Sequence, residues 1–143
     1  MADIVFQVDI AADAATVARA VTSRDGIRGW WTAAAEVPAE VGGVMQLRFQ
    51  RAPLPFELRV DERTNERVRW SLAGTFPPHW VNTTIEWRFT SVPDGPGTRV
   101  SFRHAHWPSD DGLFGETAYT WGTLMTALKR FVETGSTEGR LPS

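Results

Sequence analysis

The sequence predicts an α+β fold in which an antiparallel sheet of six or seven strands is covered on one face by a long C-terminal helix. Most segments alternate apolar and polar residues with a period of two, the pattern of strands that bury one face. Short turns separate these segments, and such connections join antiparallel neighbours. Residues 113–134 change to helical spacing. Because each strand keeps a polar face, we expect cover on one side of the sheet only.

The N-terminal part predicts one strand followed by one or two short helices. Residues 4–10 alternate strictly between apolar and polar side chains. Asp13 then stands where an N-cap residue begins a helix that runs to about Ser23. A second turn or short helix is expected over residues 25–31, and Gly42-Gly43 interrupts the chain before the next strand.

Five further alternating segments predict the rest of the sheet. Pro53 and Pro55 bracket one turn between them, and a proline- and glycine-rich turn at residues 93–97 precedes the last strand. These strands are expected over residues 44–50, 56–61, 68–72, 81–90 and 98–106.

The last strand and the last helix have matching lengths. Residues 98–106 span about 30 Å as a strand, and residues 113–134 span about 33 Å as a helix. A helix as long as the strand it covers can enclose a space between them. Residues 135–143 are expected to be a frayed tail.

Composition narrows the class of protein. The 143 residues are expected to form a single domain, and the absence of cysteine excludes disulfides and thiolate sites. The net charge of −2 and the dispersed arginines argue against a nucleic-acid partner. No apolar run is long enough to insert into a membrane, and no secretory signal is evident, so a cytoplasmic location is expected. Seven tryptophans and eight phenylalanines against one tyrosine indicate an aromatic core or an aromatic-lined cavity.

Two histidines stand two residues apart on the last strand. Alternation predicts that His104 and His106 share its inner face. They could be polar groups in an apolar cavity, an acid and base pair, or histidines satisfied by backbone or water at the strand end. A metal would need a third ligand, and the inward positions supply no carboxylate. We therefore predict no metal and no cofactor.

The inward side chains give the candidate ligand-binding set. Adjacent tryptophans between the short helices and the sheet could close one end of a cavity or anchor the helices. Trp70, Trp87 and Trp121 could line a cavity or fill the core. The complete predicted set is Trp30, Trp31, Phe49, Phe56, Leu58, Trp70, Leu72, Thr83, Ile85, Trp87, Phe102, His104, His106, Thr117, Trp121 and Met125.

Several short motifs occur in a characteristic order. They are Ile10 with Asp13 to Val21 after the first strand, Trp30-Trp31, Val41-Gly42-Gly43, Val68-Arg69-Trp70, Gly97-Thr98-Arg99-Val100 with His104, and Trp121 with Leu124, Leu128 and Gly135. Across its whole length the chain resembles the helix-grip (START and Bet v 1-like, SRPBCC) superfamily. Within it, the chain is similar to polyketide-cyclase-like domains and to single-domain proteins like the C-terminal domain of the Hsp90 ATPase activator. This resemblance implies a curved sheet that grips the C-terminal helix around a hydrophobic tunnel.

These features are compatible with three functions. The first is binding of a small hydrophobic or aromatic ligand, such as a lipid or a polyketide-like molecule, between helix and sheet. The alternative is a cyclase- or dehydratase-type enzyme with His104 or His106 as the catalytic base. Interaction with Hsp90 ranks last, because fold analogy is a weak argument for function. A homodimer is left open.

Overall fold

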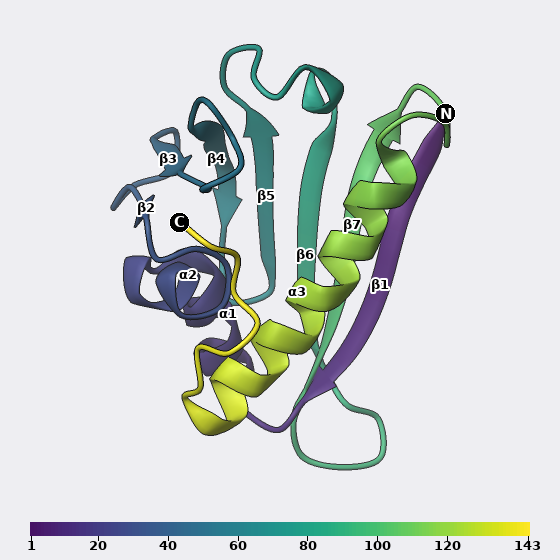
Figure 1. The fold of residues 1–143 in the computed structure, drawn as a ribbon. Helices are drawn as coiled ribbons and strands as arrows, with labels where there is room; N and C mark the ends of the chain where they lie inside the picture. Colours follow the sequence, from purple (N-terminus) through teal and green to yellow (C-terminus); the bar gives the residue numbers. More distant parts are fainter.

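A seven-stranded antiparallel sheet and three α helices make up the computed structural model, which describes residues 1–143 (Figure 1). The spatial order of the strands is β1-β7-β6-β5-β4-β3-β2. The strands are β1 (Ala2–Ile10), β2 (Ala35–Glu36), β3 (Val44–Leu47), β4 (Phe56–Arg63), β5 (Arg67–Leu72), β6 (Thr84–Ser91) and β7 (Thr98–Trp107). The helices are α1 (Ala14–Thr22), α2 (Arg24–Trp30), the short 3-10 helix η1 (Pro78–Trp80) and α3 (Phe114–Thr134). The predicted α+β helix-grip architecture is confirmed.

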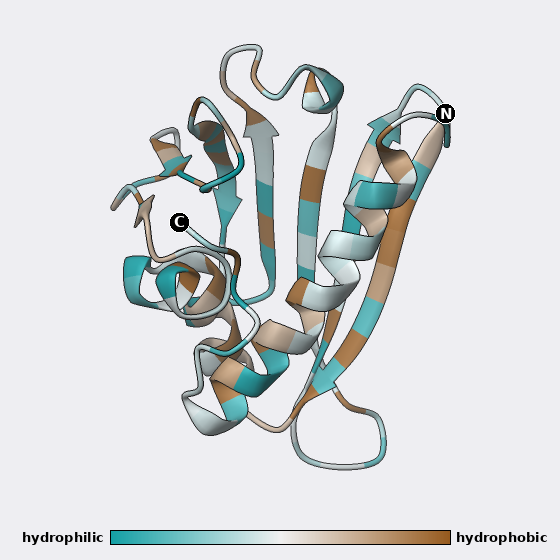
Figure 2. Cartoon of the chain, in the orientation of Figure 1, coloured by the Kyte–Doolittle hydropathy of each residue, from teal (hydrophilic) through white to brown (hydrophobic).

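Helix α3 lies across one face of the sheet, and α1 and α2 cover the end of the same face (Figure 1). Hydrophobic and hydrophilic residues alternate along several strands (Figure 2), and alternation turns apolar side chains to one face of a sheet. Five tryptophans are fully buried in this layer: Trp30, Trp31, Trp70, Trp87 and Trp121. No helix has the combination of length and apolar character that a membrane crossing requires.

Local capping explains where the short helices begin. The Asp13 carboxylate accepts a hydrogen bond from the Thr16 backbone N–H at 2.8 Å, and Ser23 Oγ accepts one from the Gly26 N–H at 3.0 Å. Both residues are therefore N-caps. The predicted helices after the first strand are confirmed, and they place adjacent Trp30 and Trp31 at the end of α2.

Residues 135–143 are packed against the domain, so the prediction of a frayed tail is wrong. Gly135 ends α3 in the left-handed region at φ 79° and lets the chain turn back. The Leu141 N–H then donates to the Trp31 carbonyl at 2.8 Å, and the Gln50 N–H donates to the Pro142 carbonyl at 2.9 Å. These long-range bonds could not be read from local composition, because their partners lie far away in the sequence.

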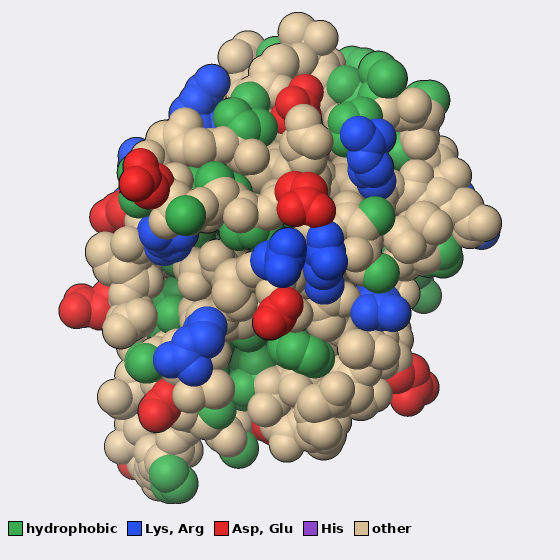
Figure 3. Space-filling model, turned by 90° about the vertical axis from the view of Figure 1, so that its left-hand side faces the viewer, with side chains coloured by type: hydrophobic (Ala, Val, Ile, Leu, Met, Phe, Trp, Pro, Cys, Tyr) green, Lys and Arg blue, Asp and Glu red, His purple; other side chains and the backbone are tan.

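Positive and negative side chains are interspersed on the molecular face beside β2 and β3 (Figure 3). One of the contacts there joins Arg28 to Glu36 at 2.7 Å. This face shows no large block of one sign, in keeping with the dispersed arginines in the sequence.

Candidate ligand-binding site

A cavity of about 330 Å³ opens between α3, η1 and the β3–β4 connection. Aromatic and aliphatic side chains form most of its wall, and polar side chains stand among them. The lining residues are Trp31, Phe49, Arg51, Ala52, Phe56, His79, Trp80, Leu113, Glu116, Thr117, Thr120, Trp121, Leu124 and Leu141. A volume and composition of this kind are typical of small-molecule sites.

Five residues of the predicted ligand-binding set line this cavity: Trp31, Phe49, Phe56, Thr117 and Trp121. The other inward residues pack elsewhere in the core, because alternation identifies the inner face of a strand but not how far along it a cavity extends. Those that do not line the cavity are Trp30, Leu58, Trp70, Leu72, Thr83, Ile85, Trp87, Phe102, His104 and Met125. Binding by any of these residues other than His104, which is described below, stays a prediction.

Sequence reasoning missed one whole wall of the cavity. Residues 76–80 look like an irregular proline-rich connection before the strand expected from Val81, but Pro78 begins the 3-10 helix η1, which carries His79 and Trp80, and β6 begins only at Thr84. Proline at the first helical position followed by an aromatic residue is a signal that could have indicated this turn. Leu141 was missed because the C-terminal residues were expected to be free of the domain.

The prediction that His104 and His106 share one face is wrong. Strand β7 has a β-bulge: Ile4 of β1 lies opposite His104 and Ala2 lies opposite Trp107, so one residue of β1 faces two of β7. His106 takes φ 72°, and its N–H donates to Asp3 Oδ1 at 3.1 Å. The extra residue inverts the alternation, so His104 is buried and His106 is exposed.

His104 lies behind the cavity wall in a continuous hydrogen-bond chain. The Trp121 indole N–H donates to His104 Nδ1 at 3.2 Å, and Thr83 Oγ1 lies 2.8 Å from His104 Nε2. Because an indole nitrogen can only donate, the imidazole proton is on Nε2 and is donated to Thr83. Thr83 in turn donates to the Trp80 carbonyl at 2.7 Å. His104 thus positions Trp121 and η1, both of which form the wall.

Burial lowers the pKa of His104 from 6.5 to about 3, with a smaller contribution from His79. The ring is therefore neutral over the physiological range. It has no exposed surface and does not line the cavity, so it cannot touch a ligand held there.

Stability is expected to fall as pH is lowered below 6.5, because the unfolded chain gains a proton on His104 that the folded chain does not accept until pH is about 3. This group alone contributes a slope of about 1.4 kcal/mol per pH unit. Urea unfolding measured between about pH 6.5 and about pH 5.5, above the ordinary glutamate pKa of 4.5, tests this. His79, whose pKa is also lowered by burial, adds to the slope in the same direction. A His104→Phe variant with an unchanged slope would contradict the assignment to His104.

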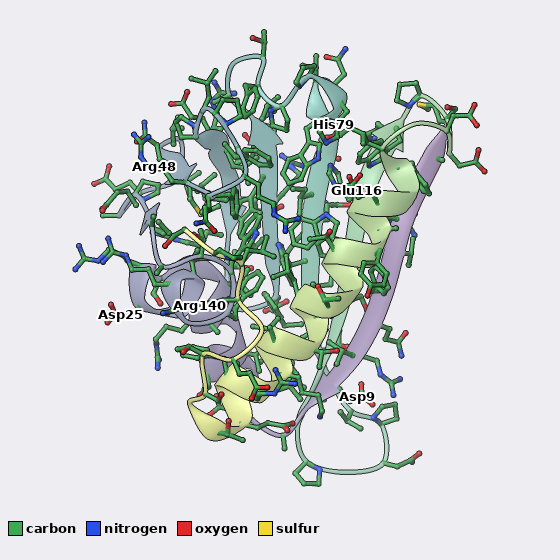
Figure 4. The ribbon with its side chains drawn as sticks, in the orientation of Figure 1. Asp9, Asp25, Arg48, His79, Glu116 and Arg140 are labelled. Carbon is green, nitrogen blue, oxygen red and sulfur yellow. The ribbon has the colours of Figure 1, made fainter.

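His79 and Glu116 bring an imidazole and a carboxylate to the rim of the cavity (Figure 4). Burial lowers the pKa of His79, and the negative charge of Glu116 acts in the opposite direction. His79 comes from η1 and Glu116 from the first turn of α3, so the two elements bring them to one part of the rim. No group of three or more His, Cys, Asp or Glu side chains is arranged to hold a metal ion.

Together the fold and the cavity define a helix-grip architecture with a space of ligand size beneath its C-terminal helix. Residues 11–133 match the family described as activator of Hsp90 ATPase homolog 1-like protein, and the chain belongs to this family. The resemblance stated from the sequence motifs is confirmed. No curated protein matches the chain.

Solved structures with the same fold include the Aha1 dimer from Colwellia psychrerythraea. It is 26% identical, with a TM-score of 0.85 over 94% of this chain and 98% of that one. Protein SSP2350 from Staphylococcus saprophyticus is 18% identical, with a TM-score of 0.79 over 99% and 98% of the two chains. CalU16 from Micromonospora echinospora is 19% identical, with a TM-score of 0.70 over 91% of this chain and 73% of that one. The last two similarities show the fold alone.

Proposed function

We propose that the protein binds a small hydrophobic or aromatic ligand, such as a lipid or polyketide-like molecule, in the cavity between α3 and the sheet. The observation that carries this proposal is the cavity of about 330 Å³, in which nine of fourteen lining residues are hydrophobic. Apolar walls with a few polar groups bind a ligand through burial and orient it through hydrogen bonds. The volume lies at the low end of the usual range for ligand sites, which favours compact guests.

Blocking the cavity is expected to abolish binding. Thr120 lines the cavity from a half-buried position on α3, so a phenylalanine there would occupy the space. Thr123 is exposed on the same helix and does not line the cavity, so Thr123→Phe is the matched control. Calorimetric titration with naphthol, naphthoic acid, a fatty acid and an anthraquinone is the measurement. At least one compound should bind the wild type and Thr123→Phe, and none should bind Thr120→Phe.

Equal binding by Thr120→Phe and the wild type would place the ligand elsewhere on the molecule. Failure of the wild type to bind any member of the panel would count directly against a ligand-binding function. Circular dichroism of both variants checks that the fold is retained.

The cyclase- or dehydratase-type alternative loses its two candidate catalytic residues. His104 is fully engaged behind the wall, and His106 lies on the exposed side of the bulge. A general base must come within hydrogen-bond reach of the proton that it removes. Neither histidine meets that condition for a molecule held in the cavity.

Interaction with Hsp90 is the second candidate function, and the family match is what favours it. It still ranks behind ligand binding, because membership of a fold family is a weak argument for one activity. Measurement of Hsp90 ATPase turnover with and without the protein tests it. We also propose a homodimer, on the precedent of the dimeric Aha1 from Colwellia psychrerythraea. Light scattering after gel filtration measures the mass directly.

A further inference from the structure

The cavity contains polar groups that have no partner within the protein. Arg51, His79 and Glu116 take part in none of the six ion pairs of the chain, and their side chains form no internal hydrogen bond. Charges of opposite sign therefore face this space while remaining free to bind a guest. Arg51 is the only arginine or lysine among the lining residues.

Thr117 adds an observation of a different kind. The residue is only 9% exposed, and its hydroxyl, which remains accessible, forms no hydrogen bond within the protein. Other helical threonines of this chain donate to the carbonyl four residues earlier, as Thr22 does to Ala18 at 2.9 Å and Thr134 does to Arg130 at 2.7 Å. An accessible hydroxyl that has no partner in the protein is free to form a hydrogen bond with a ligand in the cavity.

Most of these groups come from two segments that lie apart in the fold and that both line the cavity (Figure 1). Arg51 comes from the connection between β3 and β4, whereas Glu116 and Thr117 come from the first turn of α3 (Figure 1). His79 stands beside Glu116 (Figure 4). One side thus offers a cation, and the other offers a carboxylate, an imidazole and a hydroxyl.

Aromatic rings form much of the wall between the two sides. Trp121 lies 5.1 Å from Trp31 and 6.1 Å from Trp80, measured between ring centroids, and the Trp80 and Trp121 planes are within 22° of each other. Phe49 and Phe56 form an edge-to-face pair 4.9 Å apart. Such surfaces suit a planar aromatic guest better than a flexible alkyl chain, because ring stacking gains energy beyond buried area.

We propose, on the basis of the ligand-binding function above, that the cavity selects a planar aromatic carboxylic acid with a hydrogen-bond donor at the end opposite its carboxylate. The carboxylate pairs with Arg51, and the ring system lies against Trp31 and Trp121. The donor group at the far end bonds to Glu116, and the Thr117 hydroxyl bonds to the same end of the guest. Hydroxylated aromatic acids of two or three fused rings have this chemistry.

The test uses naphthol, naphthoic acid and a hydroxynaphthoic acid whose two groups lie at opposite ends of the rings. Calorimetry with the wild type should rank hydroxynaphthoic acid tightest, by about tenfold over naphthol, as expected for one charge-assisted hydrogen bond. Arg51→Gln should remove this advantage and leave naphthol binding unchanged. Arg48→Gln is the matched control, because Arg48 is an exposed arginine on the same segment outside the cavity (Figure 4).

Glu116→Gln tests the other end of the cavity. This substitution should weaken the binding of hydroxynaphthoic acid by about threefold to tenfold and leave the binding of naphthoic acid unchanged, since only hydroxynaphthoic acid has a hydroxyl that can donate to the Glu116 carboxylate. If all three compounds bind the wild type and Arg51→Gln with equal affinity, this selectivity is overturned while the ligand-binding function stands. If none of the three binds and the wider panel also fails, the function itself is overturned, and the selectivity with it.

Discussion

Replacing His104 by phenylalanine is expected to lower the free energy of unfolding by about 3 kcal/mol at neutral pH. Phenylalanine has nearly the same shape, so the loss comes from hydrogen bonding. The Trp121 indole N–H would lose its 3.2 Å bond to Nδ1 in a buried position, and the Thr83 hydroxyl would lose its 2.8 Å contact with Nε2. Urea unfolding followed by circular dichroism measures the change.

His106 supplies the control for this prediction. Its side chain is exposed and its φ of 72° suits asparagine, so His106→Asn should change stability by less than about 0.5 kcal/mol. A similar loss in the two variants, or a loss below about 1 kcal/mol for His104→Phe, would show that the buried hydrogen-bond chain is not a major stabilising feature.

The second large effect is expected at Gly26, where α1 and α2 meet. A Cβ atom there would lie 2.5 Å from both the Cα and the carbonyl oxygen of Ala20. These are backbone atoms, and the same carbonyl accepts the Trp30 indole N–H at 2.8 Å. Gly26→Ala must therefore separate the two helices, at a cost of about 3 kcal/mol. Thermal unfolding is the measurement.

Gly115 is the matched position, because it also lies in a helix but a Cβ there would have no neighbour within 4 Å. Gly115→Ala should stabilise the protein by up to about 1 kcal/mol through helix propensity. If Gly26→Ala raised the stability to the same extent, helix propensity would outweigh the close approach to Ala20. Trp31 directly follows α2 and lines the cavity, so Gly26→Ala should also weaken the binding of any ligand held there.

The sequence predicts the layers of this fold well because its repeating patterns are local. Strand alternation places Ile85, Trp87 and Phe89 on the buried face, and all three are buried. Helical spacing over residues 113–134 matches α3, which runs from Phe114 to Thr134. The tyrosine at position 119, which helical spacing directs away from the sheet, is 76% exposed. In each case neighbouring residues carry enough information to set the face.

The candidate site depends on contacts between distant segments, and the sequence predicts it only in part. One bulged residue in β7 moves His106 out of the interior, and no local signal in residues 98–106 marks the position of that bulge. The hollow lies where η1, the β3–β4 connection and the returning C-terminal segment meet α3. Whether rings such as Trp70 and Trp121 fill a core or face a space depends on how neighbouring volumes pack. The sequence alone therefore determined the sheet, the covering helix and the inward faces. Only the tertiary structure decided where the cavity lies and which polar groups reach it, because cavity position is a property of packing among segments and not of periodicity along one segment.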